Sequence, residues 1–177
     1  MDFFEVVNQR HSIRAYENRL IELETLQRIL QAANKAPSAG NLQAYEVYLV
    51  CDDQHKTSLV AAAYDQEFLA QAPIVLVFCA HAERSADRYQ ERGTDLYCVQ
   101  DATIACTYAM LAATALGLST VWVGAFDEDK VRTTIGAPLG HRPVAMLPMG
   151  YAAESPRNRP RRKLSELLHQ VQRIIPG

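Results

Sequence analysis

The sequence predicts a single domain of mixed α and β structure that spans residues 1–177. Of the 177 residues, 49% are hydrophobic and 21% are charged, as in an ordinary globular domain. About four short apolar segments alternate with about six helical ones, and no change in composition marks a second domain. A doubly wound sheet would suit this order too, but no strand is followed by a Gly-rich phosphate turn and no Walker A sequence occurs.

The N-terminal quarter predicts two helices joined by a polar segment. Residues 2–9 place Phe3, Val6 and Val7 on one helical face. The polar run 10–14 interrupts this pattern, and apolar residues then recur at helical spacing through 22–34. Small and turn-forming residues at 36–41 end the second helix.

The next segments alternate strand and helix. Residues 45–51 alternate in the manner of a strand, and 54–64 and 65–72 have helical character. The continuous apolar run 73–79 is typical of a strand that is buried on both faces. Residues 82–92 are polar and charged, and are expected to form an exposed helix or a mobile loop.

Residues 94–116 form the longest helix candidate, and it is apolar nearly all round. Such a helix is buried in a folded domain, and its many alanines permit close packing. Gly117 is expected to cap the C-terminal end of this helix. Further along the chain, strands are expected at 119–123 and at 142–147, the second ending at Pro148. A short helix is expected at 127–135, an extended basic segment at 156–163 and an amphipathic segment at 164–175.

Charge and cysteine usage narrow the class of protein. The formal charge of -2 argues against a nucleic-acid or anionic-membrane partner. The uncharged stretch 73–80 is too short to cross a bilayer, and the acidic N-terminus is unlike a signal peptide. The four cysteines lie in apolar runs without CxxC spacing, which favours buried free thiols. We therefore expect a cytoplasmic protein.

The first group with chemical potential is Arg10-His11-Ser12-Ile13-Arg14. Guanidinium groups present a planar fork of donors that matches phosphate, and serine adds a neutral donor. The segment therefore suits an anionic ligand. The alternative is a solvated loop between two helices.

Two further groups are less specific. The segment around Gly40 combines small side chains with the donors and acceptors of side-chain amides, and its candidate residues are Pro37, Ser38, Asn41 and Gln43. Such a combination suits the edge of a heterocycle. A helix-ending turn has the same composition. Residues 123–125, Val-Gly-Ala, would leave backbone N–H groups uncovered beside a planar ligand, or would simply connect a strand to a helix.

The fourth group is the run 157–163, in which five of seven residues are cationic. Such a run is commonly a solvated face or a nucleic-acid patch, and it could also close over one phosphate. There is no G-x-S-x-G, no HExxH and no acidic cluster with metal spacing, and the five histidines are scattered. We assign no catalytic side chain and no metal ligand, so any hard chemical step would need a cofactor.

Five motifs occur in an order that resembles the nitroreductase family of FMN-dependent oxidoreductases. They are RHSIR, APSAGNLQ, VWVGAFDEDKVR, RPVAMLPMGYAAE and RPRRKL, and they cover essentially the whole chain. Each motif is weak alone, but five in the right order are specific. Ala44-Tyr45 stands where many relatives have Pro-Trp, which bears on the choice of substrate.

The resemblance implies an α+β fold with a mostly antiparallel central sheet flanked by helices. It also implies an intertwined homodimer with FMN at the subunit interface. The apolar helix at 94–116 would supply much of that interface, and residues 164–177 would embrace the partner subunit.

The resemblance also implies the cofactor contacts. Arg10, His11, Ser12 and Arg14 would bind the FMN phosphate and ribityl chain, and Arg159 and Arg161 would complete the phosphate clamp. Pro37, Ser38, Asn41 and Gln43 would come from the other subunit. Val123, Gly124 and Ala125 would lie along the isoalloxazine, with the Gly124 N–H directed to flavin N5. Arg157, Arg162 and Lys163 could remain solvated.

The implied activity is electron transfer from NAD(P)H through FMN to a small acceptor, such as a nitroaromatic or a quinone, by a ping-pong mechanism. One alternative keeps FMN and changes the reaction to that of a dehydrogenase, a dehalogenase or a flavin-fragmenting enzyme, since fold does not fix function. Another is a nucleic-acid-binding module that uses 157–163.

Overall fold

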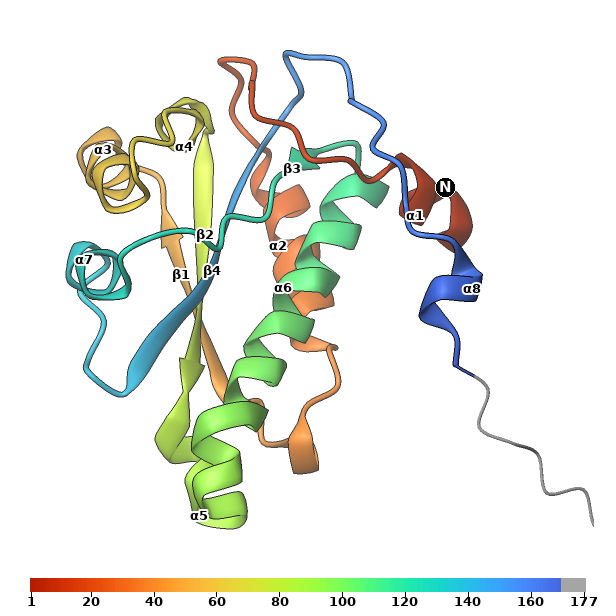
Figure 1. Ribbon diagram of the computed structural model, residues 1–177. Helices are drawn as coiled ribbons and strands as arrows, with labels where there is room; N and C mark the ends of the chain where they lie inside the picture. The colour runs from red at the N-terminus through yellow and green to blue at the C-terminus, as the bar shows by residue number, and fades with distance from the viewer. Residues whose placement is uncertain (170–177) are drawn as a thin grey trace, which may run out of the picture.

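A four-stranded antiparallel sheet forms the centre of the protein (Figure 1). The computed structural model describes residues 1–169, and the sheet comprises β1 (Tyr45–Val50), β2 (Ile74–His81), β3 (Ser119–Thr120) and β4 (His141–Gly150). The order across the sheet is β1-β2-β4-β3, with every neighbouring pair antiparallel. The expected α+β fold is therefore confirmed, and a doubly wound parallel sheet is excluded.

β2 is the buried centre of the sheet. Its residues from Ile74 to Ala80 are all buried, as the unbroken apolar run predicts. Leu76 and Phe78 pack into the core on one face, while Val75 and Val77 pack into the core on the other. Because successive side chains in a strand point to opposite faces, this alternation means that both faces are covered.

Helices cover the two faces of the sheet (Figure 1). α2 (Leu23–Asn34) and α6 (Cys98–Ala115) lie on one face, and α3 (Asp53–Ala62), α4 (Phe68–Gln71) and α7 (Glu128–Thr134) on the other. α5 (Ala82–Arg92) continues from β2, and one wider helical turn at Gly93–Tyr97 leads into α6. α1 (Phe3–Gln9) and α8 (Leu164–Leu167) lie outside these layers. None of the described helices has the length and apolar character needed to span a bilayer.

Alanines let α6 pack closely against α2 and the sheet. Ala102, Ala105, Ala109 and Ala113 are all 0% exposed. Gly117 follows the helix with φ +80°, a conformation that costs glycine little. The helix begins four residues later than predicted, because residues 93–97 form the wider turn.

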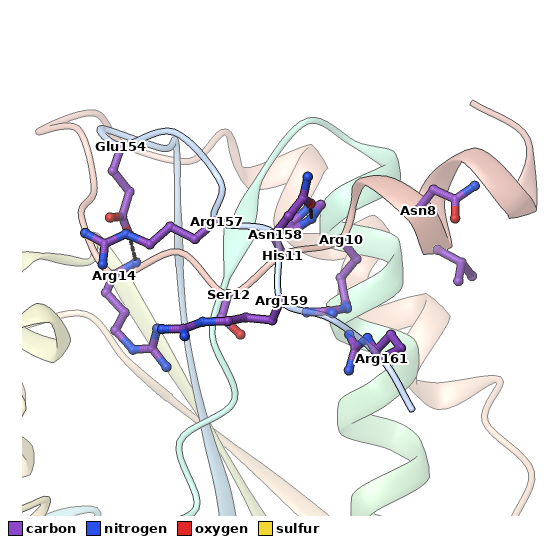
Figure 2. A pocket seen from close by; sticks show the side chains of 11 residues that line it. Asn8, Arg10, His11, Ser12, Arg14, Glu154, Arg157, Asn158, Arg159 and Arg161 are labelled. Carbon is purple, nitrogen blue, oxygen red and sulfur yellow. Dashed lines mark hydrogen bonds between the residues drawn. The ribbon is translucent and has the colours of Figure 1, made fainter. Parts of the chain in front are cut away.

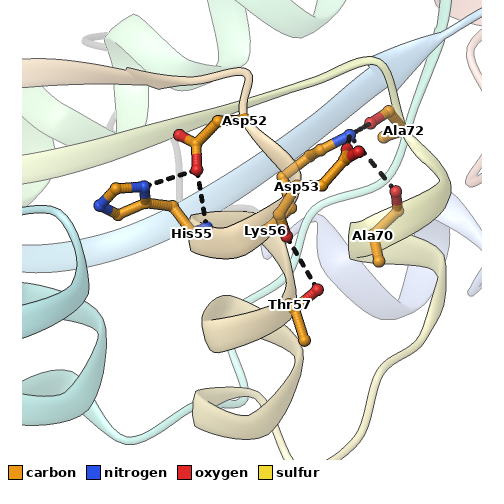
Figure 3. Close-up of polar contacts among 7 residues, drawn as sticks. All are labelled: Asp52, Asp53, His55, Lys56, Thr57, Ala70 and Ala72. Atoms are coloured by element: carbon orange, nitrogen blue, oxygen red, sulfur yellow. Dashed lines mark hydrogen bonds and ion pairs between the residues drawn. The ribbon is translucent and has the colours of Figure 1, made fainter.

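A buried lysine closes the corner between α3 and α4 (Figure 3). Lys56 is 6% exposed, and its Nζ donates to the carbonyls of Ala72 at 3.1 Å and Ala70 at 3.4 Å. It also lies 3.0 Å from a carboxylate oxygen of Asp53. The ammonium group thus satisfies carbonyls at the end of α4 that the helix itself leaves free.

Several other predicted elements are shorter than expected. The helices at 54–64 and 65–72 are shorter because Tyr64 and Asp65 have φ of +56° and +61°, which breaks the helix between them. β3 ends at Thr120, although Val123 still pairs with Met146 as an isolated bridge.

Cys51 is exposed just beyond β1, whereas the other three cysteines are buried, and all four are free thiols.

β4 continues through Pro148, where the sequence predicts its end. Pro148 pairs with Val75 of β2, and its carbonyl accepts a hydrogen bond from the Tyr16 hydroxyl at 3.3 Å. β3 pairs only with residues 149 and 150, so no strand requires an N–H from position 148. A proline is tolerated in a strand at such a position.

Candidate functional site

Arginine side chains line a pocket of about 880 Å³ between the segment after α1 and the segment after β4 (Figure 2). Its lining brings together two stretches that lie near opposite ends of the described chain. They are Val7, Asn8, Arg10, His11, Ser12 and Arg14 from the first stretch, and Glu154, Arg157, Asn158, Arg159 and Arg161 from the second.

The first stretch is held against the sheet edge. The Asp2 carboxylate caps α1 by accepting from the Glu5 N–H, and the helix ends before Arg10. Ser12 then bridges to Thr120, and the Ile13 N–H donates to the Thr120 carbonyl at 3.1 Å. Ile13 is buried, so this anchor fixes the backbone that carries the neighbouring polar side chains.

Hydrogen bonds tie the second stretch to the first. The Glu154 carboxylate accepts from the backbone N–H of Arg14. The His11 Nδ1–H donates to the Gln9 carbonyl, and His11 Nε2 lies 2.9 Å from Asn158 Oδ1. These contacts join segments that are distant in sequence into one wall (Figure 2).

The pocket has an uncompensated positive charge. Its five guanidinium groups belong to Arg10, Arg14, Arg157, Arg159 and Arg161, and within residues 1–169 none of them forms an ion pair. Burial, and then the nearby charge of Arg161, lowers the pKa of Arg10. A polyanion such as a phosphate monoester would relieve this repulsion.

A buried carboxylate shapes the loop at 37–43. Asp101, in the first turn of α6, is 2% exposed and accepts from the backbone N–H of Ala39 at 2.9 Å and of Ala44 at 3.2 Å. Gly40, Asn41 and Gln43 all have positive φ. The Ser38 hydroxyl accepts from the Gln43 N–H at 3.0 Å.

This loop lies at the opposite end of α6 from the arginine pocket (Figure 1). His11, which also lines the arginine pocket, shares a smaller pocket with Gly117, and Gly117 lies just past the last turn of α6. Asp101, which holds the loop, lies in the first turn of the same helix. An 18-residue helix is about 27 Å long. The loop of one chain therefore cannot line the arginine pocket of that same chain.

Residues 123–125 lie in the connection from β3 to α7, outside the pocket lining. Val123 exchanges two backbone hydrogen bonds with Met146, each of 2.9 Å, and the Ala125 carbonyl accepts from Gln66 Nε2. Gly124 N–H has no hydrogen-bond partner in the part of the chain that the structure describes. A Cβ at Gly124 would lie 3.1 Å from Trp122 Nε1, so a larger residue would crowd the indole.

The structure brings together six of the thirteen residues singled out from the sequence: Arg10, His11, Ser12, Arg14, Arg159 and Arg161. Sequence reasoning missed Asn8, Glu154 and Asn158, and it left Arg157 solvated. The recurrence of arginine at 157, 159 and 161 was the available signal, since alternate residues of an extended segment share a face. Arg162 and Lys163 are exposed, and Arg162 donates to the Glu166 carbonyl.

Comparisons with known proteins identify the family of this chain. The family model described as the nitroreductase family matches residues 7–66 and 54–151. A Thermus thermophilus protein named NADH dehydrogenase is 31% identical, and the match covers 82% of this chain and 84% of that protein. A Bacillus subtilis protein named FMN reductase [NAD(P)H] is 29% identical, over 93% of this chain and 71% of its own.

A solved structure, that of NfrA2 from B. megaterium, superposes with a TM-score of 0.89 at 27% sequence identity. The match covers 98% of this chain and 76% of that one. Sequence motifs, fold and family model thus coincide over most of the chain, which belongs to the nitroreductase family.

Proposed function

We propose that this protein is an FMN-dependent oxidoreductase that takes electrons from NAD(P)H and delivers them to small acceptors such as nitroaromatics or quinones. Family membership supports the activity. The observation that carries the proposal is the arginine pocket, whose five guanidinium groups have no acidic partner among residues 1–169. A phosphate dianion matches the planar donor forks of these guanidinium groups.

The residues present fit the FMN phosphate. Arg10 and Arg14 would contact it from one segment and Arg159 and Arg161 from the other, and the Ser12 hydroxyl would supply a neutral donor. Glu154, the acidic side chain in the lining, directs an oxygen to the Arg14 backbone N–H. That contact fixes the backbone and leaves the guanidinium groups available to the phosphate.

We further propose that a second copy of the chain completes the site with Pro37, Ser38, Asn41 and Gln43. The distance between this loop and the arginine pocket within one chain supports that arrangement. Apolar side chains on α1 and α8 also lack cover: Phe4 is 74% exposed and Leu164 is 80% exposed. Such side chains are expected at an interface between subunits.

The chain contributes position and electrostatics. The chemistry that bound FMN would supply is acceptance of a hydride from the nicotinamide, followed by delivery of the electrons to an acceptor. The two substrates would bind in turn, as a ping-pong mechanism requires. The free Gly124 N–H is suited to donate to the N5 edge of the ring, and Val123 and Ala125 would lie along its face. No side chain is assigned as a general acid or base.

Absorption spectroscopy of the purified protein, followed by anaerobic titration with NADH and NADPH, tests this function. We expect a flavin spectrum that bleaches with a nicotinamide, and parallel double-reciprocal lines in steady-state assays with a nitroaromatic. A colourless protein that takes up no added FMN would contradict the proposal. If neither nicotinamide reduces the FMN-loaded protein, the assignment of FMN as cofactor stands and the proposed reaction is wrong.

A further inference from the structure

Glu46, His81 and His141 form a second cluster of polar groups, far from the arginine pocket. Each offers one ligand atom, and the three atoms lie within 4.8 Å of one another. His81 Nδ1 is 3.0 Å from a carboxylate oxygen of Glu46, and the rings of His81 and His141 have centroids 4.5 Å apart. All three side chains are partly buried.

Strand pairing places these residues on one face of the sheet. His81 of β2 lies directly opposite His141 of β4, and Glu46 of β1 lies opposite Cys79, two residues before His81. Directly opposed and diagonal neighbours of this kind are within side-chain reach. His81 immediately precedes α5, so the cluster lies at the end of the sheet remote from α1 (Figure 1).

The donor set suits a transition-metal ion. Two imidazoles and one carboxylate are the ligands that Zn²⁺ commonly takes, whereas Ca²⁺ and Mg²⁺ prefer oxygen atoms alone. In a tetrahedral site with bonds of about 2.0–2.1 Å, ligand atoms lie about 3.4 Å apart. The ligand atoms of the cluster lie within 4.8 Å of one another, so each pair is within about 1.4 Å of that spacing.

A neighbouring tyrosine orients one ligand. The Tyr48 hydroxyl lies 2.6 Å from His141 Nδ1, and a metal bound through Nε2 would leave the Nδ1–H to donate to this oxygen. Contacts of this kind fix the ring of a metal-binding histidine.

We propose that Glu46, His81 and His141 bind one divalent transition-metal ion, with Zn²⁺ the first candidate, and that the ion cross-links β1, β2 and β4. The remaining coordination positions fall to water. The His81 N–H donates to the Ala44 carbonyl, so the cross-link stabilises the base of the loop at 37–43. None of its three ligands is among the residues assigned to FMN.

Equilibrium dialysis of the untagged, FMN-loaded protein against micromolar Zn²⁺, with elemental analysis, tests the site. We expect one zinc ion per chain, and at least tenfold weaker binding in His81→Gln and His141→Gln. Tyr48→Phe keeps all three ligands and is expected to weaken binding about tenfold. Zn²⁺ should raise the melting temperature of the wild type and not that of His81→Gln.

His55→Gln is the matched control, since among residues 1–169 the ring of His55 pairs with Asp52 and no other acidic side chain, and its loss should leave zinc binding unchanged. FMN content and melting temperature in chelator show whether each variant is folded. A wild-type protein that takes up no zinc overturns the proposal. So do His81→Gln and His141→Gln variants that bind zinc as tightly as the wild type. Neither result affects the assignment of FMN.

Discussion

Arg10 and Arg161 lie beside each other in the pocket, although they come from distant parts of the chain and carry the same charge (Figure 2). Burial and this neighbouring charge both disfavour the protonated form of Arg10, so its pKa is lowered. Two adjacent cations destabilise the empty pocket. A bound dianion would neutralise this repulsion and attract both guanidinium groups, so the arrangement favours retention of a phosphate-bearing ligand.

The double variant Arg10→Ala/Arg14→Ala should lose FMN. Each charge-assisted hydrogen bond contributes roughly 1.5–3 kcal/mol, so removing two should weaken FMN binding by roughly 10²- to 10⁴-fold. Quenching of flavin fluorescence during titration of the apoprotein measures this change.

Two comparisons isolate the phosphate contact in that experiment. Arg162→Ala is the matched control, because Arg162 lies outside the pocket lining and bonds Glu166. Riboflavin, which lacks the phosphate, should bind the double variant about as well as it binds the wild type. Unchanged FMN affinity in the double variant would refute the phosphate assignment.

Asp101→Asn should weaken FMN binding without removing any cation. One Asp101 oxygen accepts from the N–H of Ala39, inside the loop at 37–43, and the other from the N–H of Ala44, the residue that follows the loop. An asparagine retains one acceptor and presents an NH₂ group to the other N–H, so one charge-assisted bond is lost and a donor is left unpaired. Hydrogen exchange at residues 39 and 44 should accelerate, and FMN affinity should fall roughly tenfold.

Asp129→Asn is the control for this variant, because Asp129 is exposed and its carboxylate forms an ion pair with Arg132, away from the loop. If residues 39 and 44 exchange faster in Asp101→Asn while FMN affinity stays at the wild-type value, the loop has no part in holding the cofactor.

Local chemistry explains what could be predicted of the fold. Asp127 caps α7 by accepting from the Lys130 N–H, and the helix starts where that residue type indicates. The unbroken apolar run of β2 likewise predicts its burial. The end of β4 could not be predicted, because Pro148 is tolerated only where β3 has already ended and Tyr16 supplies the donor to its carbonyl.

The site was predictable where its residues are contiguous. Arg10, His11, Ser12 and Arg14 follow one another in the chain, so their shared chemistry is visible in the sequence. The position of the loop at 37–43 is not visible, because it depends on the length and direction of α6. Glu46 and His81 are brought together only by strand register, and no motif spacing reveals them.

Lys56→Met should destabilise the fold while leaving the pocket intact. Methionine preserves most of the packing of the lysine stem but leaves the carbonyls of Ala70 and Ala72 without their donor. We expect the free energy of unfolding to fall by about 1–3 kcal/mol in urea titrations. Asp53→Asn is the control, because the Asp53 side chain is 96% exposed; it should change the free energy of unfolding by no more than about 0.5 kcal/mol. Equal losses in the two variants would show that the carbonyl contacts contribute nothing.

Tyr16→Phe should reveal a pH-dependent contribution to stability. The buried Tyr16 hydroxyl donates to the Ile13 carbonyl at 2.8 Å, so its loss should cost about 0.5–1.5 kcal/mol near neutral pH. Burial, which outweighs the nearby charge of Arg14, raises the pKa of Tyr16 above its usual 10.0. The folded chain therefore keeps this proton at pH values where the unfolded chain releases it.

The stability that Tyr16 adds is consequently complete below about pH 10 and is lost as the pH rises further, by up to about 1.4 kcal/mol per pH unit. Urea unfolding of wild type and Tyr16→Phe from about pH 8 to about pH 11 should show a stability difference that shrinks above about pH 10. The exposed Tyr64 provides the control, since Tyr64→Phe should differ from wild type by the same small amount throughout. A constant difference for Tyr16→Phe would mean that the hydroxyl is accessible to ionisation in the folded state.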